Sequence, residues 1–182
     1  MLIHINSYPG VGKLTIALAL RPLIGGRVLD NHSVYNVAFA LTEFKSQAFY
    51  DTVRAVRKIA YARVLDLPST TPVILTNAHS EDSDWGNECW DDAIALAEKR
   101  GSPLFNVVLS CDPEVNAQRI QGPERIGGRK PRDPDMFPGN RMGRRLLSRG
   151  GDALLELDVS NLSAVDAATT VAAWLREQGG AA

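Results

Sequence analysis

The feature that most constrains this chain is a short glycine-containing loop between an apolar run and a helical pattern. Leu2–Ile5 has the composition of a buried strand, and a helical pattern runs from Lys13 to about Arg21. The loop and the first turn of this helix read Ser7-Tyr8-Pro9-Gly10-Val11-Gly12-Lys13-Leu14-Thr15. A strand, a glycine-containing loop, a lysine and a helix in this order are typical of a phosphate-binding loop.

The physical basis of this prediction is the backbone of the loop together with one cation. Gly10 and Gly12 allow successive N–H groups to point inward and form an anion nest. The N-terminus of the helix adds the positive end of its dipole, and Lys13 adds a point charge for the β and γ phosphates. The predicted nucleotide-binding residues here are Pro9, Gly10, Val11, Gly12, Lys13, Leu14 and Thr15.

The remaining sequence alternates short apolar runs with helical patterns. The expected strands are Leu2–Ile5, Arg27–Leu29, Pro72–Leu75, Leu104–Leu109 and Ala153–Leu157. The expected helices are Lys13–Arg21 (stopped by Pro22 and Gly25-Gly26), Ser46–Leu65, Ser83–Arg100, Asp112–Ile120, a short basic helix ending at Arg149, and a last helix capped by Ser163. Buried strands separated by helices predict an α/β fold, a three-layer α/β/α sandwich around a five-stranded parallel sheet. No linker divides residues 1–182, so we expect a single domain.

Charge is unevenly distributed along the chain. The net charge is -1, from 20 basic and 21 acidic residues. Between Arg119 and Arg149, however, nine basic residues stand against three acidic ones, and the run from Glu81 to Asp92 contains acids and no base. Within the basic stretch, residues from about 121 to 138 are rich in Gly, Pro and Arg, which predicts a mobile basic lid.

Composition also excludes several classes of protein. A net charge near zero does not suit a general nucleic-acid coat, and two cysteines do not make a disulfide framework. No apolar run reaches the roughly 20 residues of a membrane helix, and the N-terminus lacks the basic start of a signal peptide. We expect a cytoplasmic protein with no membrane partner.

The pattern Pro9-Gly10-x-Gly12-Lys13-x-Thr15 resembles the phosphate loop of adenylate-kinase-like phosphotransferases. Together with the basic stretch Arg119–Arg132 and the segment Leu157–Asn161, the chain resembles the small P-loop kinases, the group of shikimate kinase, gluconate kinase and chloramphenicol phosphotransferase. This resemblance implies a P-loop NTPase fold of the nucleoside-monophosphate-kinase type with strand order 2-3-1-4-5. It also implies an enzyme that uses ATP and Mg²⁺ to phosphorylate a hydroxyl of a small molecule.

Two positions in the loop depart from the usual pattern. Ser7 stands where the first glycine is usual, and Leu14 stands where a hydroxyl residue normally follows the lysine. The hydroxyl is found instead at Thr15. We therefore expect Mg²⁺ to be held through water by Thr15 and Asp30.

The resemblance also implies roles for residues outside the loop. Asp30 would be the general base or hydroxyl-orienting group, with His32 able to share that work; the alternative is that Asp30 only caps the following helix. Arg125, Arg129 and Arg132 would close over the γ-phosphate, the alternative being a solvated basic loop. Arg119 would pack against adenine, and Asn161 would lie along the ring or form a plain turn.

Other residues leave alternatives open. The third strand ends in Thr76-Asn77, where many P-loop enzymes have an aspartate. Trp85 and Trp90 belong to the core or wall an acceptor pocket, and His4 is expected to be structural. Cys89 and Cys111 are expected to be buried packing residues. The alternative function is a nucleotide-binding ATPase or regulatory module, with nucleic acid bound by the basic stretch. The acceptor is not identifiable from the sequence.

Overall fold

The computed structural model describes residues 1–122, 132–134 and 145–179. Its centre is a parallel sheet in the order β2-β3-β1-β4-β5, which confirms the expected fold class and strand order. Every neighbouring pair of strands in this sheet is parallel. The strands are β1 (Leu2–Ser7), β2 (Arg27–Asp30), β3 (Val73–Asn77), β4 (Leu104–Ser110) and β5 (Ala153–Asp158).

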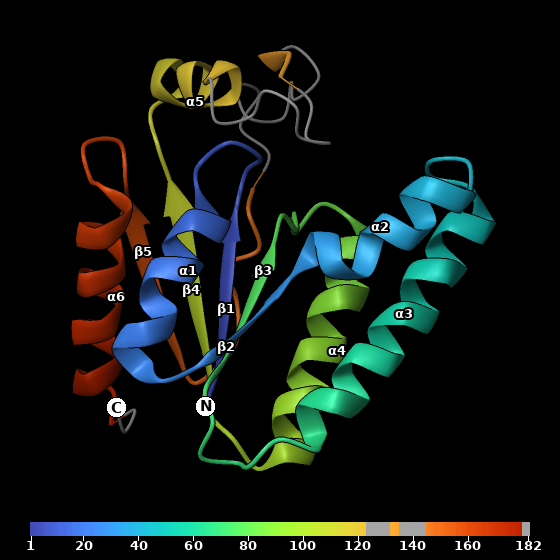
Figure 1. Ribbon diagram of the computed structural model, residues 1–182, viewed down its shortest axis with the longest axis horizontal. Helices are drawn as coiled ribbons and strands as arrows, with labels where there is room; N and C mark the ends of the chain where they lie inside the picture. The colour runs from blue at the N-terminus through green and yellow to red at the C-terminus, as the bar shows by residue number, and fades with distance from the viewer. Residues whose placement is uncertain (123–131, 135–144, 180–182) are drawn as a thin grey trace.

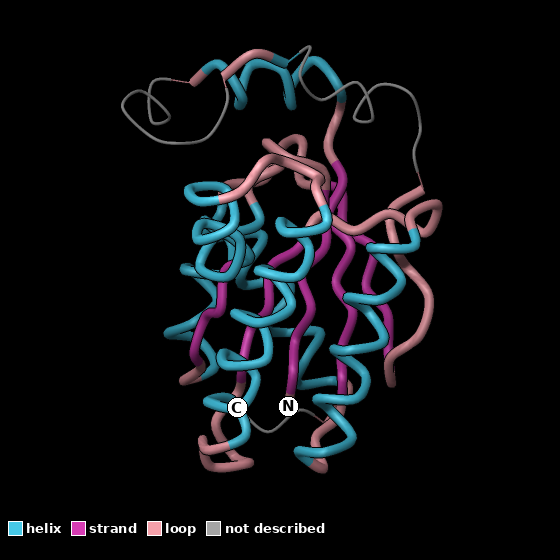
Figure 2. Tube along the Cα trace, turned by 90° about the vertical axis from the view of Figure 1, so that its right-hand side faces the viewer, coloured by secondary structure: helices cyan, strands magenta, loops and turns pink. Residues whose placement is uncertain are grey.

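Helices cover both faces of this sheet. They are α1 (Lys13–Ile24), α2 (Asn31–Leu41), α3 (Gln47–Leu65), α4 (Asp84–Arg100), α5 (Pro113–Gln121) and α6 (Ala164–Glu177). Figure 1 shows α1 and α6 together on one side, α2, α3 and α4 on the other, and α5 above the ends of the strands. The N-terminus and the last turn of α6 lie at the opposite end of the sheet (Figure 2). Among the described helices, none combines the length and apolar composition needed to cross a bilayer.

The two faces follow from the alternation of side chains along each strand. Ile3 and Ile5 of β1 belong to the buried cluster that includes α1 and α6, whereas Leu2 belongs to the cluster around Trp90 of α4. Trp90 is fully buried, so it is a core residue. His4 lies beside it, with ring centroids 4.8 Å apart, and is fully buried as expected of a structural residue.

Side-chain caps begin most helices at the positions that the sequence indicates. Ser46, Ser83, Asp112 and Ser163 each accept a hydrogen bond from a backbone N–H of the following turn. The helix N-termini are therefore set by local chemistry, which is why they were predictable.

Three expectations about elements were wrong. α1 continues through Pro22 to Ile24, so Pro22 does not stop it, whereas Gly25, at φ 64°, is its C-cap as expected. α2 was missing from the expected helices and was implied only by the alternative that Asp30 caps a following helix, because α2 starts directly after β2 and carries exposed apolar residues that obscure its pattern. The described end of the expected basic helix, Arg145–Arg149, is not helical, because its backbone pairs with the segment after β3, through Leu147 N to His79 O (3.0 Å).

Cysteine burial was predicted correctly at one of two positions. Cys89 is buried, whereas Cys111 is only half-buried because it follows the end of β4 at the edge of the sheet. Most of the expected lid, including Arg125 and Arg129, lies outside the described residues.

Candidate functional site

The loop between β1 and α1 has the backbone shape of an anion nest. Gly10 and Gly12 have φ values of 93° and 111°, which L-residues with side chains rarely adopt. Gly12 is the N-cap of α1 and offers no side-chain acceptor to the N–H groups of the first turn. Those N–H groups form the kind of helix N-terminus to which anions bind.

Lys13 lies across this loop. Its Nζ is 3.5 Å from both the Ser7 and the Tyr8 carbonyl oxygens, to which it donates. Ser7 is fully buried and its Oγ donates to the Tyr8 carbonyl at 3.0 Å. The residue that replaces the usual first glycine therefore uses its hydroxyl inside the loop.

α5 packs directly against the loop at Gly10. A Cβ atom on Gly10 would lie 2.5 Å from Ile120 Cγ1, closer than real contacts allow. Asn116 Nδ2 donates to the Pro9 carbonyl at 3.0 Å on the same side. Gly10 is therefore required both by its backbone angle and by the close approach of α5.

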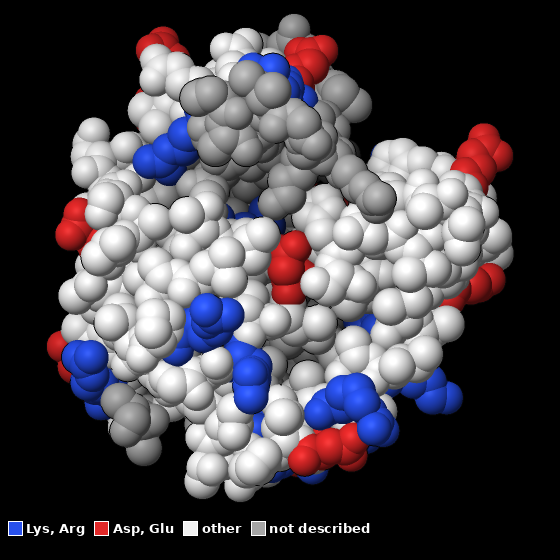
Figure 3. All heavy atoms as spheres, in the orientation of Figure 1, with Lys and Arg blue, Asp and Glu red and all other residues white. Residues whose placement is uncertain are grey.

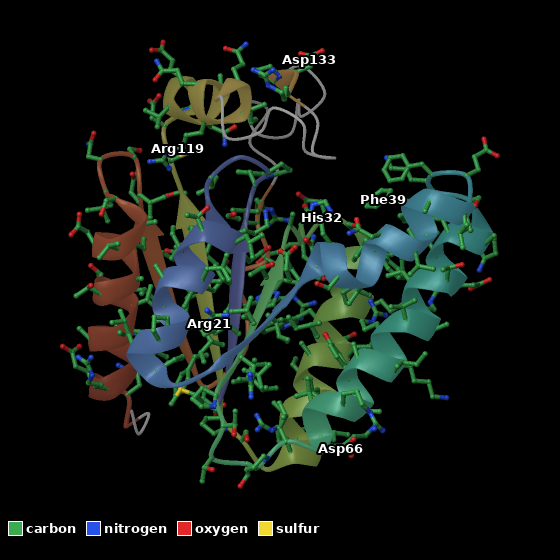
Figure 4. The ribbon with its side chains drawn as sticks, viewed as in Figure 1. Arg21, His32, Phe39, Asp66, Arg119 and Asp133 are labelled. Carbon is green, nitrogen blue, oxygen red and sulfur yellow. The ribbon has the colours of Figure 1, made fainter. Side chains whose placement is uncertain are left out.

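Arg119 joins the loop to the connection between β5 and α6. Its Nη1 donates to the Val11 carbonyl (2.9 Å), and its Nη2 donates to the carbonyls of Val159 (2.7 Å) and Ser160 (3.2 Å). Figure 4 shows Arg119 between α5 and the ends of α1 and α6. These contacts make Arg119 a support of the loop, beside the segment that continues into Asn161. Its expected packing against adenine stays a prediction.

Asp30 lies at the end of β2, and both of its carboxylate oxygens have partners. Oδ1 accepts from Thr76 Oγ1 at 2.5 Å, and Oδ2 accepts from the His32 N–H at 3.2 Å. The second bond makes Asp30 the N-cap of α2, as the alternative interpretation expected. The first joins it to Thr76, which stands where many P-loop enzymes have an aspartate. Because only β3 separates β2 from β1, Asp30 lies roughly 10 Å across the sheet from the phosphate loop.

The candidate oxygen ligands suit Mg²⁺ better than a metal ion that is coordinated entirely by protein side chains. Among the described residues, no group of three His, Cys, Asp or Glu side chains could hold a metal ion. Mg²⁺ keeps several waters and is usually bound by one or two carboxylates together with substrate phosphates. The Asp30 carboxylate and the exposed Thr15 hydroxyl fit that requirement.

A small cavity lies between β2, β3, α2, α3 and α4, and two of its lining residues, Leu29 and Asn31, flank Asp30 in the chain. Its wall includes Asn31, Tyr35, Tyr61, Asn77, His79 and Arg57. The enclosed volume is about 20 Å³, which is room for about one water molecule. Asn31 Oδ1 and His79 Nδ1 are buried and have no hydrogen-bond partner among the described residues. Burial lowers the pKa of His79 well below its usual value, so the ring is neutral.

Sequence reasoning did not identify Tyr35 or Arg57 as parts of this site. Tyr35 was missed because α2 was missed. Arg57 could have been identified from its spacing in the sequence, since it follows Phe49 and Val53 at intervals of four residues on the buried stripe of α3. A lone arginine on such a stripe requires an acidic or polar partner.

The partners of Arg57 come from α4. Its Nη2 contacts Glu88 Oε1 (3.2 Å) and Asp92 Oδ2 (2.5 Å), and its Nη1 donates to Cys89 Sγ. Burial raises the pKa of the Cys89 thiol to about 11 although Arg57 opposes this shift. Trp85 lies against the Arg57 guanidinium and donates to Tyr35 Oη at 2.8 Å. Trp85 thus supports Arg57 and Tyr35, two residues of the cavity wall.

The acidic run and the end of the basic stretch contact each other. Arg145 Nη2 donates to Asp82 Oδ1 (3.0 Å), and the Ser148 N–H donates to Glu81 Oε1 (3.1 Å). Arg132, the described arginine of the expected lid, donates to the Gln121 carbonyl (2.7 Å) at the end of α5. On the face drawn in Figure 3, the described Lys and Arg side chains are scattered among neutral and acidic ones.

Comparison with known proteins establishes the fold. No protein-family model and no curated protein matches the chain. Among solved structures, a protein of Chloroflexus aurantiacus assigned to the kinases with no substrate named matches at TM-score 0.69 and 21% identity, over 98% of this chain and 96% of that one. A gluconokinase from Sinorhizobium meliloti matches at TM-score 0.60 and 16% identity, over 97% and 93% of the two chains. An APS kinase from Mycobacterium tuberculosis, in complex with AMPPNP and APS, matches at TM-score 0.60 and 15% identity, over 96% of each chain.

These likenesses confirm the resemblance at the level of the fold. The chain has the fold of the P-loop kinases of the adenylate-kinase-like type. Identities of this size carry no substrate from one protein to another.

Proposed function

We propose that this protein is an ATP-dependent phosphotransferase that moves the γ-phosphate of ATP to a hydroxyl of a small molecule. The observation that carries the proposal is the placement of two groups at one edge of the sheet. Lys13 lies over a loop shaped for phosphate at the end of β1. Asp30 lies at the end of β2, two strands from β1, and is held by Thr76 of the intervening β3. In open parallel sheets, this carboxyl edge is where ligands bind. Solved kinases of the same fold, one of them with AMPPNP, support the use of a nucleotide.

In this proposal, the phosphate loop binds the nucleotide. The N–H groups of residues 10 to 15 cradle the phosphates, and Lys13 turns from the carbonyls of Ser7 and Tyr8 to the β and γ phosphates. Arg119 keeps the loop in place through the Val11 carbonyl. Arg125, Arg129 and Arg132 supply positive charge over the transferring group, as proposed from the sequence, and Asn161 lies near the base.

Asp30 prepares the acceptor. The acceptor oxygen forms a bond to the γ-phosphorus, the bond from that phosphorus to the β–γ bridging oxygen breaks, and ADP leaves with the bond's electron pair. The hydroxyl proton passes to the Asp30 carboxylate, which the Thr76 hydroxyl and the His32 N–H hold in place. Thr15 and Asp30 would hold Mg²⁺ through water, and the ion supplies neutralisation of phosphate charge.

The test of nucleotide binding is thermal unfolding with and without ATP. A ligand at about a hundred times its Kd stabilises the native state by about 2.7 kcal/mol. We expect ATP with Mg²⁺ to raise the melting temperature of the wild type and to have no such effect on Lys13→Ala. Lys58→Ala removes an exposed lysine of α3 and is the matched control, which should respond like the wild type. An equal response of Lys13→Ala and the wild type would contradict the assignment of the loop as the nucleotide-binding site.

The alternative of a nucleic-acid-associated module has less support. Arg145 is paired with Asp82, and Arg149 donates to Asn87 Oδ1 (2.8 Å), so the described end of the basic stretch faces acidic and polar side chains of the same chain. A basic surface that binds phosphate backbones keeps its cations available to the nucleic acid.

A further inference from the structure

Among the described residues that line the cavity between the sheet and α2, α3 and α4, one has a charged side chain. Arg57 is that residue, and its side chain is only 8% exposed. The remaining wall is formed by aliphatic, tyrosine, asparagine, histidine and cysteine side chains. Whether Arg57 can attract an anionic acceptor therefore decides the charge of the molecule that this cavity receives.

The positive charge of Arg57 is already balanced by two carboxylates of α4. Both Glu88 and Asp92 contact its Nη2. Arg54 in turn pairs with Glu88 at 2.7 Å and with Asp51 at 2.9 Å. This cluster, which we call the α3–α4 charge cluster, contains two arginines and three carboxylates.

An anionic group would gain little in these surroundings. An anion beside Arg57 would be attracted by the guanidinium and repelled by the two carboxylates that already pair with it, so the two effects oppose each other. Removing an anion from water is a further cost. The net charge of the cluster therefore disfavours a carboxylate or a phosphate in the cavity.

Two residues of the cavity wall, Asn31 and His79, each have a side-chain atom that could form a hydrogen bond with an uncharged group of a ligand. Asn31 Oδ1 and His79 Nδ1 are both buried without a partner among the described residues. His79 is 7% exposed and stacks against the buried His4, which orients its ring. An amide oxygen only accepts, so its partner must donate, whereas a neutral imidazole nitrogen accepts or donates according to the tautomer. A hydroxyl group both donates and accepts, so it has the chemistry to bind either atom.

We propose that the acceptor places an uncharged, hydroxyl-bearing portion in the cavity between Asn31, His79 and Tyr35, and that Arg57 is a structural cation of the wall and not an anion-binding residue. The assignment rests on the phosphotransferase function proposed above. The volume of the cavity admits about one hydroxyl-sized group, so the rest of the acceptor lies outside it. Two residues of its wall, Leu29 and Asn31, flank Asp30 in the chain.

The test is a panel of matched acceptors assayed by ADP release with saturating ATP and Mg²⁺. The two pairs are glucuronamide with glucuronate, and methyl α-glucoside with α-glucose 1-phosphate; the members of each pair carry the same free hydroxyls and differ in charge. We expect kcat/KM for the uncharged members to exceed that for the charged members at least about tenfold, which corresponds to about 1.4 kcal/mol. A carboxylate or phosphate turned over best would overturn the assignment while leaving the phosphotransferase function intact.

Substitution of the acidic partners tests the physical cause. The double variant Glu88→Gln with Asp92→Asn leaves Arg57 without a countercharge, so the preference for uncharged acceptors should shrink or reverse. Asp91→Asn removes an exposed carboxylate of the same helix and should keep the wild-type preference. Asp92→Asn alone, which retains Glu88 beside Arg57, gives a smaller shift and serves if the double variant does not fold. An unchanged preference in folded Asp92→Asn and in the double variant would contradict the role given to the cluster.

Two further outcomes separate this assignment from the proposed function. If ATP stabilises the protein but no member of the panel is phosphorylated, the assignment of an uncharged acceptor fails and nucleotide binding stands. If ATP neither stabilises the protein nor yields ADP, the proposed function itself fails.

Discussion

The hydroxyl of Thr76 donates a hydrogen bond to the Asp30 carboxylate at 2.5 Å and thereby joins the ends of β3 and β2. The same hydroxyl accepts from the Asn31 N–H at 3.3 Å, so it also steadies the first turn of α2. Asp30 is thus oriented by a neighbouring strand and by the helix that it caps. The cap and the hydrogen bond from Thr76 are structural roles of Asp30, and they can be tested separately from its proposed role as the base.

Asp30→Asn should abolish most turnover while leaving the fold in place. Asparagine caps helices as well as aspartate does, so α2 is expected to remain, but an amide cannot take a proton from the acceptor. The expected loss in kcat is about 10²- to 10⁴-fold with ATP still bound, measured by ADP release and by ATP-dependent thermal stabilisation. Full turnover in this variant would mean that Asp30 is only a cap.

Thr76→Val should lower kcat by about ten- to a hundredfold, because a hydrogen bond to a charged group is worth about 1.5–3 kcal/mol. Thr76→Ser retains the hydroxyl and is expected to stay close to the wild type. The two variants are compared at matched stability, checked by their melting temperatures. Equal kcat values for the valine and serine variants would remove Thr76 from the account of Asp30.

Gly10 and Gly12 differ in a way that stability measurements can separate. Both have positive φ, so alanine at either position introduces strain of about 1–3 kcal/mol. Only Gly10 faces Ile120, whereas nothing lies within 4 Å of a Cβ at Gly12. We expect Gly10→Ala to lower the free energy of unfolding more than Gly12→Ala does, as measured by denaturant unfolding.

A double-mutant cycle isolates the contact with Ile120. Gly10→Ala combined with Ile120→Ala should cost less than the sum of the two single changes, by about 1 kcal/mol or more. The corresponding cycle with Gly12→Ala should be additive. Additivity in both cycles would show that α5 does not pack on the loop as described.

Two buried histidines predict a loss of stability in mild acid. Burial lowers the pKa of His4 to about 4, although the hydrogen bond to Asn106 opposes the shift, and burial also lowers the pKa of His79 well below its usual value. The unfolded chain therefore binds more protons than the native state below pH 6.5, and stability falls as the pH drops towards 4. For His4 alone, the loss between pH 7 and pH 5 is about 2 kcal/mol.

Urea unfolding at pH 7 and pH 5 measures this effect in a range where carboxylates titrate little. His4→Gln should flatten the pH dependence relative to the wild type. A wild type equally stable at both pH values would show that the two rings are not held neutral.

The parts of the site that could be predicted are those written in short sequence segments. The phosphate loop, its lysine and four helix caps each depend on residues within a few positions of one another. Asp30 was found because it ends a buried run.

The parts that were missed depend on contacts between distant segments. Arg57 pairs with Glu88 31 residues away, and Arg119 donates to Val159 40 residues away. No spacing rule links such pairs. α2 was missed for a different reason, because its exposed Val37, Phe39 and Leu41 break the amphipathic pattern by which helices are recognised.

Transfer of radioactive phosphate from γ-labelled ATP is the most direct measurement of the central claim. The protein is incubated with labelled ATP, Mg²⁺ and the acceptor panel, and the organic products are separated from inorganic phosphate. The account predicts label on an organic acceptor with the wild type, and none with Lys13→Ala or Asp30→Asn. Label recovered only as inorganic phosphate, or in equal yield from all three proteins, would contradict it.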